Sequence, residues 1–330
     1  MKTNQNECVK LRSPTGVTMS RLIALTVLLT GCTLTRHTTT PTTIPLATPV
    51  SDLAAFLATP GPITHEAVTA ARWSIPLSGL VDLTDPTAEV LTDADTPIVL
   101  PVHVLTHPDA GMFIVDTGVD SGSVDGRGPV RGLIRSFTAS MEPVESLADI
   151  LARQPAPLAG VLLTHLHLDH ILGIPDVPAS TPMFIGEGET EARKVEYALT
   201  RRTMRAVLDG HGPLHTWPVD EAISLGPVTA AWDVIGDGSL WALAMPGHTP
   251  GSTAYLARTT AGPVLFTGDT CHTRWGWEHG VTPGTFTADH VANRDSLAQL
   301  KALSALTPAM TVYVGHELSG ADTGVAALDQ

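Results

Sequence analysis

The chain has 330 residues, 43% hydrophobic and 16% charged, a composition typical of a globular protein with a large buried core. Its formal net charge of −14 argues against a nucleic-acid-binding surface, because phosphate recognition requires clustered lysine and arginine. The three cysteines, Cys8, Cys32 and Cys271, are too few for a framework of disulfide bonds.

The first 31 residues are organised like a bacterial export signal. An apolar run at residues 22–29 is too short to cross a bilayer but suits the hydrophobic region of a signal peptide. Leu29-Thr30-Gly31-Cys32 resembles a lipoprotein cleavage box, so we expect removal of residues 1–31 and a lipid on Cys32. Thr33, a residue other than Asp, implies the outer membrane, with the protein facing the periplasm. The signal could start at Met19 rather than Met1, and the alternative to a signal is an ordinary buried helix.

Residues 32–65 predict a tether between the lipid and a folded domain. They are rich in threonine and proline, and such segments bury little surface and prefer extended conformations. A short helical turn is expected at residues 53–57. The folded domain is therefore predicted to span residues 66–330.

The first half of this domain is predicted to contain short strands and helices. Residues 98–106 and 111–116 predict two strands of a hairpin, with the turn at residues 107–111. A loop rich in Gly, Ser and Asp follows at residues 120–130. Later elements are two helices at 130–139 and 144–152, strands at 160–163 and 183–186, and a helix or helix pair at 187–208.

The second half repeats the pattern of apolar strands followed by a helix. A long helix is expected at residues 288–305, capped by Thr287 or Asp289. The predicted strands are residues 214–218, 228–234, 240–244, 253–258, 264–267 and 310–314. This pattern indicates a mixed α/β protein.

A cluster of possible metal ligands follows the predicted strand at residues 160–163. It contains His165, His167, Asp169 and His170. Side chains alternate along an extended chain, so the first two histidines would point the same way, and the other two residues would reach a second point. Imidazole and carboxylate together suit a borderline metal such as zinc. The alternative is a polar strand end with solvated histidines.

Three further residues of the same kinds each lie at a turn after an apolar run: His248, Asp269 and His316. With the first cluster they make five histidines and two aspartates, enough for two metal ions. In this order the residues resemble the HxHxDH…H…D…H signature of the metallo-β-lactamase superfamily. The resemblance covers residues 70–320 and implies an α/β fold of four layers, the αββα sandwich.

The resemblance also implies a role for each ligand. His165, His167 and His248 would hold one metal ion, Asp169, His170 and His316 the other, and Asp269 would bridge the two. A hydroxide held between two such ions attacks a carbonyl at neutral pH, so Asp169 and Asp269 are expected to serve catalysis as well as metal binding. Zinc is the expected metal, with iron and manganese as alternatives.

Within the superfamily the chain resembles most the N-acyl homoserine lactonase-like group. The turn Asp116-Thr117-Gly118 and the bridging Asp269 are features of that group, in which Asp116 would be structural rather than a ligand. One position departs from the group, because His272 stands where the lactonases carry a catalytic tyrosine. A histidine could donate a proton to the leaving alkoxide there, or could replace the tyrosine without a catalytic role.

The resulting expectation is a dinuclear hydrolase of a lactone or another acyl ester, such as an N-acyl homoserine lactone. The alternatives are a glyoxalase II-like thioesterase or general esterase, and a β-lactamase. Two alternatives from other classes are an exported binding lipoprotein without catalysis and a structural zinc protein. Nothing in the sequence indicates an oligomeric state.

An apolar pocket for the acyl group is expected beside the metals. The candidate wall residues are Trp275 and Trp277, in a loop bounded by glycines, with Phe286 and Met112; ordinary core packing is the alternative. Cys271 is expected to be a packed thiol rather than a ligand. His103 and His107, in and after the hairpin strand, are expected to be structural.

Overall fold

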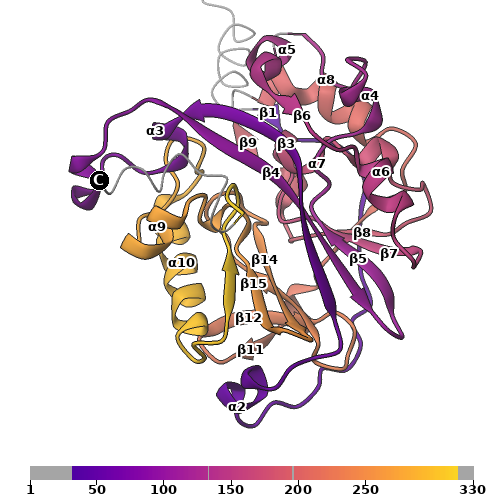
Figure 1. The fold of residues 1–330 in the computed structure, drawn as a ribbon, viewed down its shortest axis with the longest axis vertical. Helices are drawn as coiled ribbons and strands as arrows, with labels where there is room; N and C mark the ends of the chain where they lie inside the picture. The colour runs from indigo at the N-terminus through magenta and orange to yellow at the C-terminus, as the bar shows by residue number, and fades with distance from the viewer. Residues whose placement is uncertain (1–31, 133, 195–196, 319–330) are drawn as a thin grey trace, which may run out of the picture.

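Figure 1 shows the computed structural model, which describes residues 32–132, 134–194 and 197–318. Two sheets lie face to face in the middle of the molecule, and helices cover their outer faces (Figure 1). The predicted four-layer αββα sandwich is therefore confirmed. The predicted signal peptide, residues 1–31, lies outside the described residues.

The first sheet contains eight strands among the described residues, in the order β2-β10-β8-β7-β5-β4-β3-β6. Their bounds are β2 Thr39–Pro41, β3 Thr64–Pro76, β4 Asp95–His107, β5 Gly111–Val115, β6 Glu142–Pro143, β7 Leu158–Leu162, β8 Met183–Ile185 and β10 Leu214–Thr216. The hairpin of β4 and β5 is as predicted. The long strand β3 was not expected. Its alternation of apolar residues is interrupted at Ala70 and Ala71, where the pairing register shifts, and antiparallel pairing with β4 along its length stabilises it.

The second sheet contains six strands among the described residues, in chain order from β11 to β16. Their bounds are β11 Ile223–Leu225, β12 Val228–Asp233, β13 Leu240–Ala244, β14 Thr253–Thr259, β15 Gly262–Phe266 and β16 Thr311–Tyr313. Five of them fall on predicted strands; β11 was not expected. β15 and β16 are parallel, so their carboxyl ends meet at one edge.

The helices form the two outer layers. Their bounds are α2 Leu53–Ala58, α3 Leu77–Leu80, α4 Ser121–Val124, α5 Ile134–Phe137, α6 Leu147–Ala152, α7 Leu168–Ile171, α8 Tyr197–Leu208, α9 Arg274–His279 and α10 His290–Ser304. Asp289 is the cap of α10, since its carboxylate accepts hydrogen bonds from the amides of Val291 and Ala292. Of the helices in the described ranges, none combines the length and the apolar character needed to cross a membrane.

Alternation along the strands divides the core into layers. In β5, Met112 and Ile114 face the helices, whereas Phe113 and Val115 face the second sheet. Large side chains fill the layer between the sheets: Trp232, Tyr255 and Phe266 of the second sheet, and Trp217, directly after β10 of the first sheet.

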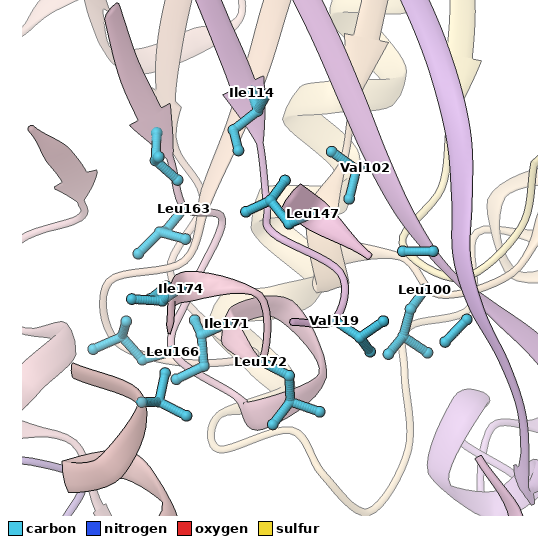
Figure 2. Packing of buried hydrophobic residues seen from close by; sticks show 14 of the residues in the cluster. Leu100, Val102, Ile114, Val119, Leu147, Leu163, Leu166, Ile171, Leu172 and Ile174 are labelled. Carbon is cyan, nitrogen blue, oxygen red and sulfur yellow. The ribbon is translucent and has the colours of Figure 1, made fainter. Parts of the chain in front are cut away.

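The layer beneath the ligand loop is aliphatic. Figure 2 shows Ile171 and Leu172, in and directly after α7, packed close to Val119 and Leu147. These side chains are at most 1% exposed. The short helix α7 is therefore held firmly where it presents its polar residues.

Residues 32–65 are packed along the domain rather than standing free as the predicted tether. β1 (Cys32–Thr33) pairs with β9 (Arg193–Lys194), and β2 forms an edge strand beside β10. Leu34 is 2% exposed and Leu57, in the confirmed helical turn at α2, is fully buried. A few buried apolar residues and pairing with a sheet edge are enough to order the segment. Its threonine- and proline-rich composition does not reveal these contacts, so the sequence predicted a tether.

Candidate metal centre

The residues predicted as ligands meet at one edge of the two sheets. Each lies in the turn that follows a strand or begins a short helix, so all seven reach the same point. The structure places them in three overlapping groups whose ligand atoms lie within 4.8 Å of one another: His165, His167, His248 and Asp269; Asp169, His170 and His316; and Asp269, His272 and His316.

Asp269 lies at the middle of the cluster, in the turn after β15. Its Oδ2 is 3.3 Å from His170 Nε2, 3.4 Å from His248 Nε2, 3.5 Å from His316 Nε2 and 3.6 Å from His165 Nε2. One carboxylate oxygen that several imidazoles approach in this way can bridge two metal ions. Gly315 makes room for it, because a Cβ on this glycine would lie 2.4 Å from Asp269 Oδ1.

The outward-facing nitrogens of several ligands are held by hydrogen bonds. His170 Nδ1 donates to Asp116 Oδ2 at 2.7 Å, and His316 Nδ1 donates to the carbonyl of Val99 at 3.1 Å. In the neutral ring, which is the form that binds metal, these bonds select the tautomer whose Nε2 carries the free lone pair, and they aim that lone pair at the centre.

Several inward-facing atoms fit bound metal better than bound protons. His248 Nε2 and His167 Nδ1 face each other at 2.9 Å. His165 Nε2, His170 Nε2 and Asp269 Oδ1 are buried and find no hydrogen-bond partner among the described residues. Buried polar atoms are seldom left in this state. A set of imidazoles and carboxylates with open lone pairs fits two divalent metal ions.

Burial keeps three of the histidines in the form that binds metal. It lowers the pKa of His165 and His248 well below the ordinary value of 6.5, and lowers the pKa of His167 to about 4. These rings are therefore neutral at pH 7.

On the other side of the cluster, nearby carboxylates raise the pKa values of the histidines instead. Burial, the largest single cause, would lower the pKa of His170 and of His316. Asp269 and Asp169, with Asp116 in the case of His170, together outweigh burial and raise both pKa values. Burial would raise the pKa of Asp269, but the surrounding histidines, His272 and His170 foremost, together hold it well below its usual range. Asp269 is therefore an anion, as a bridging ligand must be.

Asp116 supports the cluster from beneath. It has a left-handed backbone, with φ of 57°, in the turn after β5. Its Oδ1 accepts from the amide of Thr164 at 2.8 Å, while Oδ2 accepts from His170. The structure thus places Asp116 in the supporting position expected from the sequence.

A second support, Glu189, was missed in the sequence. This side chain is fully buried, and its carboxylate accepts from the amide of Leu166 at 2.9 Å and from that of Gly251 at 3.0 Å. It therefore ties the loop that carries His165 to the loop that carries His248. Nothing in its glycine- and glutamate-rich surroundings distinguishes it from a surface residue.

His272 lies within the cluster. Its Nε2 is 2.8 Å from Asp269 Oδ2, without the geometry of a hydrogen bond, and both ring nitrogens are buried without a partner among the described residues. The side chain therefore faces the same space as the ligands.

An apolar pocket of about 370 Å³ opens above the cluster. Phe286 lies in its wall, as expected. Further wall residues, which the sequence did not identify, come from β3, α5, α8 and their neighbours: Trp73, Ile75, Ile134, Phe137, Met141, Leu172, Lys194, Tyr197 and Leu199. The floor consists of the polar residues His167, Asp169, His248, Asp269, His272 and His316.

The other three predicted wall residues are wrong, because they belong to the core. The expected loop around Trp275 and Trp277 is the helix α9, capped by Thr273, which turns both indoles inward at 4% and 9% exposure. Met112 is 1% exposed and faces the helix layer from β5.

The residues expected to be structural lie outside the cluster. His107 Nε2 is 2.9 Å from Asp237 Oδ2, and its Nδ1 accepts from two amides of the hairpin turn. His103 packs against Phe266 between the sheets. Cys271 is buried, and burial raises the pKa of its thiol to about 12, as suits a packed side chain.

Comparisons with known proteins agree with this site. The metallo-beta-lactamase superfamily matches residues 96–316. The N-acyl homoserine lactonase AttM of Azorhizobium caulinodans is 31% identical over 68% of this chain and 84% of that protein, and AttM of Agrobacterium fabrum is 30% identical over the same shares.

Solved structures show the same fold. A structure of an N-acyl homoserine lactone hydrolase with N-hexanoyl-L-homoserine at its metal centre has a TM-score of 0.57 and 22% identity, covering 77% of this chain and 93% of that one. A quorum-quenching N-acyl homoserine lactone lactonase has a TM-score of 0.57 and 20% identity, covering 79% and 95%. The predicted family and its lactonase-like branch are confirmed: this chain belongs to the metallo-beta-lactamase superfamily.

Proposed function

We propose that this protein is a dinuclear metal-dependent hydrolase that opens lactones, with N-acyl homoserine lactones as its substrate class. The observation that carries the proposal is a full set of seven candidate ligands, five of which line the floor of an apolar pocket. The relationship to N-acyl homoserine lactonases at 31% identity supports the same substrate.

The metal ions would be held as the resemblance implies: one by His165, His167 and His248, the other by Asp169, His170 and His316, with Asp269 between them. Zinc is the proposed metal, and iron and manganese are the alternatives. When bound, two such ions supply a hydroxide at neutral pH and polarise a carbonyl.

The protein's own side chains would do the remaining work. The apolar wall would bind the acyl chain and exclude water, so that the ester bond rests on the polar floor. His272 would donate a proton to the leaving alkoxide oxygen as the ring opens, in the role that the lactonases give to tyrosine. Asp116 and Glu189 would hold the ligand loops in position through their hydrogen bonds.

The second candidate function is a less selective esterase or thioesterase. It is favoured by one departure, the histidine at position 272. A β-lactamase or a binding protein without catalysis is less well supported, since the bridging carboxylate and the other ligands are all present.

We also propose that the protein is exported and anchored in the cell envelope by a lipid on Cys32, at the outer membrane and facing the periplasm. The sequence around Cys32 supports this. Removal of residues 1–31 would leave Cys32 as the first residue of the mature chain.

A substrate panel tests the activity. The zinc-loaded protein would be given acyl homoserine lactones, simple lactones, aryl esters, S-acyl glutathione and a chromogenic cephalosporin. We expect fast lactone opening that Asp269→Ala abolishes and that His272→Ala lowers by about 10²–10⁴-fold in kcat. His272→Tyr should restore part of the rate. Activity confined to esters or thioesters, and indifferent to His272, would leave only the second candidate.

A further inference from the structure

The proposed lipid attachment point lies beside the mouth of the pocket. Cys32, in β1, is the direct antiparallel partner of Lys194 in β9, and Lys194 lines the pocket. Residues paired in this way have Cα atoms about 5 Å apart. Lys194 Nζ also donates to the carbonyl of Phe286 at 2.7 Å, so β9 and the segment that carries Phe286 contact each other at the mouth.

The chain is fixed to the folded body within two residues of Cys32. The amide of Leu34 donates to the carbonyl of Ala192 at 2.8 Å, and its side chain is 2% exposed in the main core. A lipid on Cys32 would therefore hold the folded body directly against the bilayer. Figure 1 shows β1, β9, α5 and α8 together at one end of the molecule, which would be the end turned to the membrane.

The rim of the pocket is apolar at this end. Phe137 on α5, Leu199 on α8 and Phe286 are 50%, 52% and 38% exposed, and all three line the pocket. Large exposed apolar side chains gathered at one opening indicate a contact surface, whereas single ones do not.

Basic residues lie on the elements that form this end of the molecule, although the whole chain is acidic. Arg36, Arg201 and Arg205 line a hollow next to Leu34, and Arg193 and Lys194 form the strand β9. This arrangement complements anionic phospholipid headgroups, to which basic clusters bind while apolar side chains reach the acyl boundary.

We propose that the pocket opens onto the surface of an anionic bilayer, so that amphiphilic acyl lactones or esters enter it from the membrane rather than from bulk water. The proposal rests on the lipid anchor at Cys32, and it explains why an apolar mouth and a group of basic residues lie at the same end of a protein with a net charge of −14.

Fluorescence quenching tests the orientation. The full chain, processed in a lipoprotein-competent bacterium and loaded with zinc, would be placed on phosphatidylethanolamine–phosphatidylglycerol vesicles that contain spin-labelled lipids. Fluorophores would be attached at Leu199→Cys and, as a control, at Leu46→Cys, which is 93% exposed beside the distant strand β11. We expect strong quenching at position 199 and little at position 46.

Equal quenching at the two positions, or a mature chain whose mass shows no lipid on Cys32, would overturn the proposal. Opening of a soluble short-chain lactone is measured in the same unlabelled preparation. If that activity is absent while position 199 is quenched, the orientation stands and the proposed function fails.

A charge reversal gives a second test. Arg201→Glu with Arg205→Glu should lower the rate on a long-chain lactone held in vesicles by about tenfold. It should leave the rate on a soluble short-chain lactone unchanged, because neither residue lines the pocket. Arg294→Glu, an exposed charge on α10, is the matched control. An equal response of the double variant and the control would contradict the proposal.

Discussion

Single residues that touch no metal decide how the ligands are held. The ligands themselves could be predicted from the sequence, because a short spacing places them on one loop and their residue types suit few other purposes. Glu189 could not be predicted, since its importance comes from two backbone amides that belong to distant loops. Only the folded chain brings those amides to one carboxylate.

Asp116→Asn tests the support beneath His170. Asparagine has the same shape and tolerates a left-handed backbone, so the turn should persist. The amide is a weaker acceptor for His170 Nδ1 than the carboxylate, and we expect zinc affinity to fall by about 10–100-fold, measured by chelator competition. Asp109→Asn, an exposed residue of the hairpin turn, is the control. Unchanged affinity in both variants would show that Asp116 does not support the centre.

Glu189→Ala tests the link between the two ligand loops. The change leaves two buried amides without an acceptor, at a cost of about 1–3 kcal/mol each. We expect the free energy of unfolding in urea to fall by about 2–6 kcal/mol. Glu189→Gln keeps one acceptor and should be milder. A loss within the experimental error of the wild type would refute this role.

At the scale of elements, the sequence predicts strands and helices best where apolar residues repeat regularly, as in β13, β14 and α10. Prediction from the sequence fails where contacts with neighbouring elements decide the structure. β3 is ordered by pairing with β4, and β2 by pairing with β10. At α9 the glycines suggested a loop, but Thr273 caps a helix and the two tryptophans fill the cores behind it.

Leu57→Ala tests whether residues 32–65 belong to the folded body. Leu57 is fully buried against the second sheet, so we expect the free energy of unfolding to fall by about 2–5 kcal/mol. Leu46→Ala, 93% exposed in the same segment, should change it by less than about 0.5 kcal/mol. Equal small effects in denaturant titrations would restore the tether interpretation.

At the scale of the whole molecule, a pair of histidines lies between the two sheets. His65 Nε2 is 3.2 Å from His103 Nδ1, and both rings pack on Phe266 and Tyr313 of the second sheet. Burial lowers the pKa of His65 from 6.5 to about 4 and that of His103 well below 6.5. The folded protein therefore resists protonation at this point.

This pair predicts a loss of stability in acid. Above pH 6.5 the rings are neutral whether the chain is folded or unfolded, so they do not affect stability. Between pH 6.5 and 4 the unfolded chain takes up protons that the folded chain does not, and the free energy of unfolding falls. We expect His65 to lower the free energy of unfolding by roughly 2 kcal/mol over this range. This is less than its full pKa shift would give, because part of the ring is exposed.

The wild type would be compared with His65→Gln/His103→Gln from pH 7.5 to 4 by urea unfolding, with His215→Gln as the control. The metal ligands titrate equally in all three proteins, so the difference between wild type and double variant isolates the pair. A difference that does not vary with pH would contradict this account.

The most direct test of the dinuclear centre is a metal titration of the intact protein. Metal-free protein would receive zinc in small steps while the opening of an N-acyl homoserine lactone is followed at each step. We predict activity that rises until two ions are bound per chain, and no activity in Asp269→Ala at any zinc concentration. Full activity with one ion or none, or activity retained without Asp269, would contradict the account.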